Sequence, residues 1–291
     1  MQNDNLQKHL HLHLIVFIWG FTAVLGALIS LDALPLVWFR MMMAIGFIAI
    51  YIIIKKIPIQ LAPKTILLLL AAGIIIALHW LTFFMAIKVS NISVTLACLS
   101  TGAFFTAFLE PLLHKTKIVL YEVFFGLVVV FGLCIIFKVE SQYTTGMLLA
   151  LTSAFLSALF SVINSKFAKI YNPTIISLYE LVGGVAFLSL FLLFSGSFDA
   201  NFFKISTSDW FYLAILSSIC TAYAFIASVG LMKYLSPYTV MLTINLEPIY
   251  GIILAIIVFQ DKEKMSTAFY IGALIILSTV ILNGILKSFK K

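Results

Sequence analysis

Apolar residues run along the chain in ten long stretches that are separated by short polar connections. Each stretch is close to the roughly 20 residues that a helix needs to cross the hydrocarbon core of a bilayer. We therefore predict membrane-spanning helices at residues 14–30, 35–54, 65–87, 91–113, 118–137, 146–165, 174–195, 208–232, 237–259 and 266–286. They fall into two sets of five.

The odd number in each set has a structural consequence. If the second set repeats the first, the two halves must lie in the membrane with opposite orientations. We assign residues 1–140 to the first repeat and 141–291 to the second, and Pro35 and Pro173 open the second helix of each. The predicted fold is an all-α integral membrane protein with ten transmembrane helices in two inverted five-helix repeats, an architecture found in secondary transporters.

Composition and charge support a membrane protein. Hydrophobic residues make up 63% of the 291 residues and charged residues only 10%, whereas charged residues reach about a quarter in soluble domains. The net charge of +7 could suggest nucleic-acid binding, but twelve lysines fall in inner segments and five in outer loops, at Lys88, Lys138, Lys204, Lys262 and Lys264. This bias places both termini in the cytoplasm, and we predict a location in the bacterial inner membrane. We expect no nucleic-acid partner.

Neither a cleaved signal peptide nor a metal site is expected. Lys8 precedes an apolar run, but no small-residue cleavage site follows, so we predict an uncleaved first helix. Cys98, Cys134 and Cys220 fall inside predicted spans, with no disulfide framework and no metal-ligand spacing. We expect no metal and no cofactor.

Several short motifs occur at defined places in the spans. They are Trp19-Gly20 in the first span, Pro35 through Phe39-Arg40 opening the second, Leu246-Glu247-Pro248 in the ninth, and Gly272 early in the tenth. With these motifs, the chain resembles the EamA-type ten-helix members of the drug/metabolite transporter superfamily over essentially its whole length. The resemblance implies a secondary carrier that exports or exchanges small metabolites, often amino acids, through a central cavity. The chain departs from the family pattern at His114-Lys115, where relatives often carry an acid.

Glu247 is the main candidate for chemistry within the membrane. It lies about eleven residues into its span, near the middle of the bilayer. A carboxylate there costs several kcal/mol unless it is paired, protonated or hydrated. Pro248 cannot donate to the carbonyl of Ile244, and Thr243 shares the face of Glu247. We predict a cavity lining or proton site; the alternative is a structural glutamate that is bonded to a neighbouring helix.

The first half lacks this acid. At an offset of 146 residues, Thr101-Gly102 stands where Glu247-Pro248 stands in the second half. We assign helix breaks to both Pro248 and Gly102, and the glycine permits flexing or close approach. Glu110 is also followed by a proline, but it lies near the inner end of its span, where we expect an interfacial position. We therefore assign the charge-dependent step to the second half.

Arg40, the only arginine, allows two interpretations. Its guanidinium could bind a carboxylate substrate, or it could extend to the outer interface or cap a loop, and we favour the structural role. Glu180 has a similar depth from the inner side, so we do not expect the two to pair directly.

Four more polar or amphipathic residues, Trp19, His79, Tyr223 and Asn245, lie well inside predicted spans. Trp19 and His79 suit a cavity wall that stacks on or hydrogen-bonds a substrate. For any single one of them we favour a hydrogen bond to a neighbouring helix, although we expect some of the set to line the cavity.

Three classes of function are possible for such a chain: a secondary carrier, an intramembrane enzyme and a non-transporting scaffold. A secondary carrier fits best, because the chain has no P-loop and would use a solute gradient or proton coupling, with Glu247 as the proton site. An intramembrane enzyme is disfavoured, since no HExxH motif or recognisable Ser/His spacing occurs, and a non-transporting scaffold is disfavoured by the small loops. The expected partners are a small-molecule substrate, the lipid bilayer and protons, and a homodimer is left open.

Overall fold

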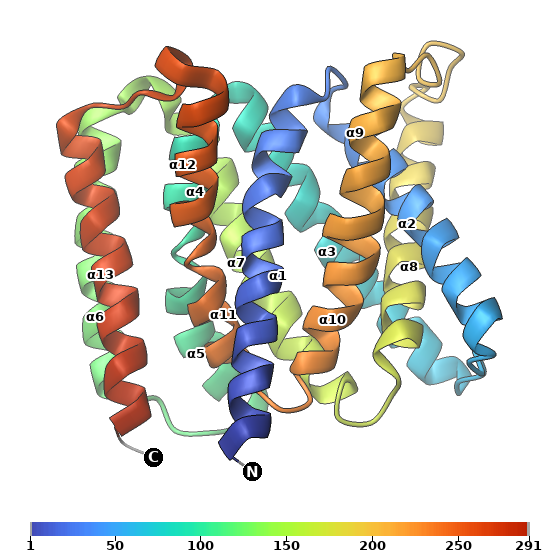
Figure 1. Ribbon diagram of the computed structural model, residues 1–291, viewed down its shortest axis with the longest axis horizontal. Helices are drawn as coiled ribbons and strands as arrows, with labels where there is room; N and C mark the ends of the chain where they lie inside the picture. Colours follow the sequence, from blue (N-terminus) through green and yellow to red (C-terminus); the bar gives the residue numbers. More distant parts are fainter. Residues whose placement is uncertain (1, 290–291) are drawn as a thin grey trace.

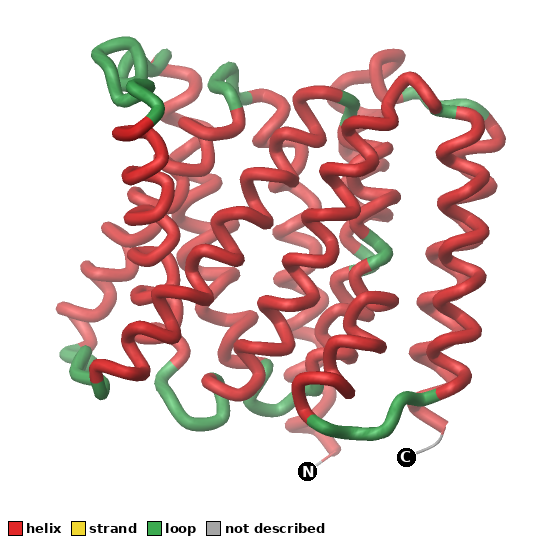
Figure 2. Tube along the Cα trace, turned by 180° about the vertical axis from the view of Figure 1, so that it is seen from behind, coloured by secondary structure: helices red, strands yellow, loops and turns green. Residues whose placement is uncertain are grey.

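The protein is described by a computed structural model over residues 2–289, in which helices and short connections alternate and no strand occurs (Figure 2). The α-helices are α1 (Gln2–Leu28), α2 (Ala33–Lys55), α3 (Pro63–Val89), α4 (Ile92–Leu99), α5 (Gly102–His114), α6 (Leu120–Val139), α7 (Thr144–Phe167), α8 (Pro173–Phe194), α9 (Thr207–Ser217), α10 (Ala224–Leu231), α11 (Pro237–Ile244), α12 (Glu247–Phe259) and α13 (Thr267–Phe289). Two 3₁₀ turns, η1 (Ser141–Tyr143) and η3 (Gln260–Glu263), and one π-helical segment, η2 (Ser218–Tyr223), complete them.

The all-helical membrane fold predicted from hydropathy is confirmed. Eight segments of the described chain are long and apolar enough to cross a membrane, and two shorter apolar helices, Val123–Val139 and Thr267–Thr279, lie where further spans were predicted. The start of the first helix differs from the prediction, because α1 begins at Gln2 and not near residue 14. Hydropathy marks only the apolar part of a helix, whereas α1 continues through its polar N-terminal turns.

The helices form one bundle with both chain ends on the same side (Figure 1). Helix α3 packs against α7 and α8, and α6 and α13 pair at one edge of the bundle (Figure 1). In this pair Gly132 and Gly272 face each other so closely that a methyl group on either would meet the carbonyl oxygen of the other. Small residues allow such close approach between membrane helices, where van der Waals contact drives association.

Two spans are interrupted near their middle. The first breaks between α4 and α5, and the second breaks between α11 and α12, where Pro248 stands in the first turn of α12. A proline has no backbone N–H to continue the helix. The first break contains no proline; instead, the Ser100 hydroxyl donates to the Ala97 carbonyl at 2.6 Å and the Thr101 hydroxyl to the Cys98 carbonyl at 2.8 Å. These carbonyls are the ones that a continuing α-helix would use.

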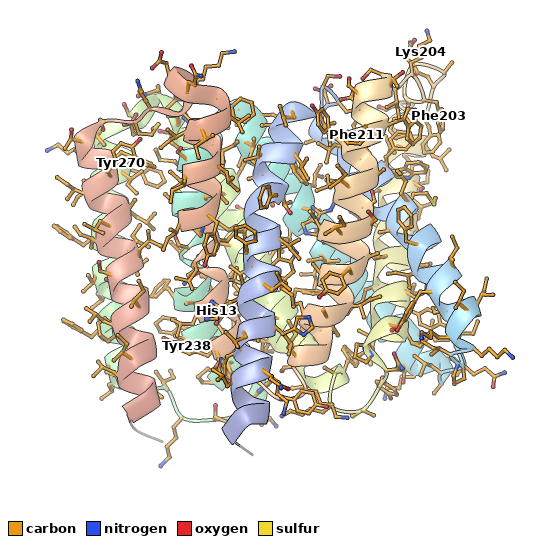
Figure 3. The ribbon with its side chains drawn as sticks, in the orientation of Figure 1. His13, Phe203, Lys204, Phe211, Tyr238 and Tyr270 are labelled. Atoms are coloured by element: carbon orange, nitrogen blue, oxygen red, sulfur yellow. The ribbon has the colours of Figure 1, made fainter. Side chains whose placement is uncertain are left out.

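The two broken spans cap each other. The carboxylate of Glu263, just after α12, accepts hydrogen bonds from the backbone N–H groups of Ile92 (3.0 Å) and Ser93 (2.9 Å) at the start of α4. Glu110 of α5 accepts from the backbone N–H of Tyr238 (3.1 Å) at the start of α11, toward the end of the bundle that holds the termini (Figure 3). Carboxylates stabilise helix N-termini through hydrogen bonds and the helix dipole. Glu110 thus has a defined helix-capping contact beyond the interfacial position that was predicted.

The span from Thr207 to Leu231 contains the π-helical segment η2, which the sequence analysis did not predict. A π turn holds one more residue than an α turn and leaves backbone groups outside the regular ladder, and such turns are frequent at functional sites. Its sequence, Ser-Ile-Cys-Thr-Ala-Tyr, includes neither glycine nor proline.

Candidate functional site

A cavity lies inside the bundle, between helices from the N-terminal and C-terminal parts of the chain. The centre of a water-sized molecule can move through about 70 Å³ of it, whereas one water needs about 10–15 Å³. Its lining residues are Trp19, Thr22, Arg40, Ile76, His79, Trp80, Phe83, Leu99, Ser157, Phe160, Ser161, Phe225, Ser228, Met232, Met241, Ile244 and Glu247. The cavity therefore combines an aromatic and aliphatic wall with a few polar groups, as small-molecule sites do.

Arg40 of α2 lies on this wall and is only 1% exposed. Its Nε donates to the Thr221 hydroxyl at 2.7 Å, and its guanidinium lies 4.0 Å from the centre of the Trp80 ring. The expectation that Arg40 extends to the outer interface or caps a loop is therefore wrong. The reason is local, because the π segment supplies an oxygen and α3 supplies an aromatic face inside the bundle.

The π segment positions two cavity residues at once. The Thr221 hydroxyl accepts from Arg40 and donates to the Leu216 carbonyl at 2.6 Å. The Trp19 indole donates to the Cys220 carbonyl at 3.1 Å. Both bonds use groups in or next to the widened turn, so η2 orients the cation and one aromatic side of the cavity.

Glu247 lines the same cavity as Arg40 and is 6% exposed. It is the first residue of α12, where the positive end of the helix dipole favours a carboxylate. Within the described residues the one ion pair closer than 4.0 Å joins Lys264 and Asp261, so no salt bridge joins Arg40 to Glu247. A cation and an acid therefore share one small cavity without neutralising each other by contact.

His79 of α3 also lies on the cavity wall. Its Nδ1 lies 2.8 Å from the Ser153 hydroxyl and 2.9 Å from the Ser153 carbonyl oxygen. These contacts fix the ring orientation between α3 and α7. Trp19 and His79 thus both line the cavity, as Arg40 and Glu247 do.

The other four predicted binding residues lie outside the lining. Thr101 and Thr243 direct their hydroxyls to carbonyls of their own helices, Cys98 at 2.8 Å and Thr239 at 3.0 Å. Asn245 is buried at the second helix break, and its amide has no protein hydrogen-bond partner.

Tyr223 also lies elsewhere than predicted. It is 45% exposed, and its hydroxyl lies 3.0 Å from Nε2 of His11. Its position follows from the π turn, since the extra residue changes which side chains of this span face inward.

The sequence analysis missed four small hydroxyl residues of the lining, Thr22, Ser157, Ser161 and Ser228. Helical spacing could have found Thr22, because it follows Trp19 by three positions and shares its face. Ser157 and Ser161 are four positions apart on α7, but no predicted site residue on that helix pointed to them. The Ser161 hydroxyl oxygen is buried and makes no hydrogen bond of good geometry with the protein.

The geometry suits solute binding. No group of three or more His, Cys, Asp or Glu residues in the described chain is arranged to hold a metal ion. The lining offers one arginine, one glutamate, four hydroxyls and several aromatic rings to an occupant of the cavity.

Comparison with known proteins gives consistent results. A model of the EamA-like transporter family matches residues 9–138 and 144–285. A protein of Archaeoglobus fulgidus described as an uncharacterized transporter is 24% identical over 286 residues, covering 96% of this chain and 98% of that protein. A protein of known crystal structure shares the fold, with a TM-score of 0.71 and 14% identity over 96% of this chain and 98% of the other.

Proposed function

Because the chain belongs to the EamA-like transporter family, we propose that this membrane transporter is a secondary carrier that exports or exchanges a small metabolite, such as an amino acid. The observation that carries the proposal is that the cation Arg40 and the acid Glu247 line one cavity without a salt bridge between them. A zwitterionic solute could neutralise both at once, with its carboxylate on the guanidinium and its amino group on the carboxylate.

The proposed mechanism is alternating access of this cavity to the two sides of the membrane. Glu247 is the group that would exchange a proton, and Trp19, His79 and the cavity hydroxyls would contact the solute. The break before Glu247 gives the carboxyl a position at a helix end, where side-chain and backbone groups can rearrange without disrupting a continuous helix. Discontinuous helices form the binding sites of several transporter folds.

The architecture that we propose has ten spans in two inverted repeats, residues 1–140 and 141–291. The matching broken spans support it, since α4 and α11 both have 8 residues and α5 and α12 both have 13. The breaks are also separated by nearly the offset found in the sequence, because α5 begins at Gly102 and α12 at Glu247 (247 − 102 = 145).

We further propose a bacterial cytoplasmic membrane location with both termini inside, on the lysine distribution. The protein would act as a transporter without enzymatic activity, and a homodimer remains compatible with the proposal. These points are independent of the cavity chemistry.

The test is an efflux assay. Cells that produce the wild-type chain, Glu247→Gln or Asp199→Asn would be compared by profiling the metabolites that accumulate in the medium. We expect at least one amino acid or related solute to accumulate with wild type and with the control Asp199→Asn, which alters an exposed loop acid, and its rate to fall about tenfold or more with Glu247→Gln.

Two results would contradict the proposal. Equal efflux by wild type and Glu247→Gln would remove Glu247 from the mechanism. No change in any solute on expression would favour the scaffold alternative, and turnover of an added substrate or lipid by the purified protein would favour the enzyme.

A further inference from the structure

Glu180 is a second buried acid that the cavity does not explain. Its side chain is 0% exposed, and neither carboxylate oxygen has a protein hydrogen-bond partner. Two other buried acids are hydrogen-bonded: Asp209 accepts from Ser30 at 2.6 and 2.8 Å, and Glu263 caps α4. Glu180 is therefore a buried titratable group whose carboxyl makes no hydrogen bond of comparable geometry.

The neighbour of Glu180 is also unsatisfied. The Asn164 amide of α7 interacts with the Glu180 carboxyl, yet neither its oxygen nor its nitrogen makes a hydrogen bond of good geometry, and its side chain is 0% exposed. Ser177, one turn before Glu180, is buried with its hydroxyl unpartnered as well. Glu180, Asn164 and Ser177 are thus three buried polar side chains, and none of them makes a hydrogen bond of good geometry with the protein.

This group adjoins the cavity through Ser161. Ser161 lines the cavity, and it precedes Asn164 by three positions, so the two side chains share one face of α7. The Ser161 hydroxyl is also buried without a partner. A row of polar side chains therefore runs from the cavity wall, past Ser161 and Asn164, to Glu180.

No cation compensates Glu180. Helix α8 packs against α2, α3 and α10. The charged or titratable residues of these helices, of α7 and of α8 itself are Arg40, Tyr51, Lys55, Lys64, His79, Lys88, Lys166 and Tyr179. None forms an ion pair with Glu180. Beside it, α3 presents Gly73, so close that a methyl group there would collide with the Glu180 carbonyl oxygen.

Glu180 has no exact counterpart in the first half. The offset of 138 residues between Pro35 and Pro173 matches Arg40 to Leu178, two positions before Glu180. Arg40 of α2 is a permanent cation, whereas Glu180 of α8 can be charged or neutral depending on its proton.

A carboxylate without a cation, a donor or water is strongly disfavoured inside a membrane protein, and a neutral carboxylic acid is not. We propose that Glu180 is a second proton-binding site of this protein. Its carboxylate takes one proton from a hydronium ion that reaches it along water entering from the cavity past Ser161 and Asn164. The hydronium becomes water, and the neutral acid that forms can donate its O–H to the Asn164 oxygen. The same proton returns to water when the row is hydrated again. Its coupling to solute movement rests on the proposed carrier function; its binding of a proton does not.

The test is infrared spectroscopy of the full-length protein in lipid bilayers at pH 7, without substrate. The carbonyl stretch of protonated carboxylic acids would be measured in Glu247→Gln, so that the cavity acid does not contribute. We expect a band that shifts in D₂O, and Glu180→Gln in the same background should lose the intensity of one carboxyl per chain. Glu140→Gln, which removes a buried acid that accepts from Ser266, should leave the band unchanged.

A second variant tests the proposal independently in case Glu180→Gln does not fold. Asn164→Leu removes the polar neighbour, and the band should move to higher wavenumber because the acid loses its hydrogen-bond partner. The proposal is overturned if the Glu247→Gln protein has no acid band at pH 7, or if the band persists in Glu180→Gln. A carboxylate band that responds to added sodium or potassium would instead identify a metal-cation site. Failure of the efflux assay alone would leave this site intact.

Discussion

At the scale of single residues, the cavity depends on how its one cation is held. Arg40 has a hydroxyl on one side and an aromatic face on another, with both partners buried in the bundle. Hydrogen bonds to charged groups contribute about 1.5–3 kcal/mol, more than neutral ones. The Thr221 hydroxyl is therefore the contact whose loss should be felt most directly by Arg40.

Thr221→Val should lower the stability of the purified protein by about 1–3 kcal/mol, because the buried Nε of Arg40 loses its acceptor. Thermal unfolding in detergent measures this as a lower Tm. Thr221→Ser keeps the hydroxyl and should remain close to wild type. In an Arg40→Met background the valine substitution should have a smaller effect, since methionine has no N–H to donate to residue 221. An equal loss in both backgrounds would show that Thr221 acts independently of Arg40.

Sequence reasoning identified the unusual cavity residues and missed the common ones. Glu247 and Arg40 are conspicuous in an apolar chain, so their candidacy required only their depth. Ser161 and Ser228 are ordinary in membrane helices, where a hydroxyl can bond its own backbone. Whether such a residue faces a cavity depends on the rotation of the helix, which apolar runs on all faces do not reveal.

At the scale of elements, the interruptions give the spans their specific shapes. Pro248 made the second break predictable, because the missing N–H is a property of that residue alone. The break after Leu99 has no proline, although a helix break was assigned to Gly102, where α5 begins, and the π segment η2 has no marker at all. Both depend on hydrogen bonds, within the turn for Ser100 and Thr101 and across helices for Thr221, and the second kind requires the tertiary structure.

Glu263→Ala should loosen the start of α4. Two buried N–H groups, of Ile92 and Ser93, lose their acceptor, at about 1–3 kcal/mol for an unsatisfied buried group. Hydrogen–deuterium exchange should rise at residues 92–95, with a lower Tm. Glu110→Ala is the matched control, since it should loosen the start of α11 and leave α4 protected. Unchanged exchange at α4 in Glu263→Ala would contradict the capping role.

At the scale of the whole molecule, hydropathy predicted the all-helical fold and the positions of the apolar segments. The helical bundle and the places of its apolar segments follow from runs long enough to cross a bilayer. The cavity did not follow, since it is formed by helices far apart in the sequence. The proposed orientation is open to direct measurement, because Lys204 lies at the end of the bundle opposite the termini (Figure 3).

Single-cysteine labelling tests that orientation. In a background without Cys98, Cys134 and Cys220, a membrane-impermeant maleimide added to intact cells should label Lys204→Cys. It should label Lys64→Cys only after permeabilisation, because this exposed site follows the α2–α3 connection on the side of the termini. The reverse pattern would place the termini outside, and labelling of both sites in intact cells would contradict the bundle topology.

The reciprocal carboxylate caps have a consequence for the order of biosynthesis. Ile92 leaves the ribosome 171 residues before Glu263, whose carboxylate caps it. Glu110 emerges 128 residues before Tyr238, from whose backbone N–H it accepts a hydrogen bond. While the chain is being made, the N–H groups at the start of α4 must therefore be hydrogen-bonded by water or lipid headgroups. The Glu110 carboxylate of α5 also lacks its partner at this stage. Each broken span is completed only when the other has been inserted, so neither half can reach its final structure as an early, independent product of translation.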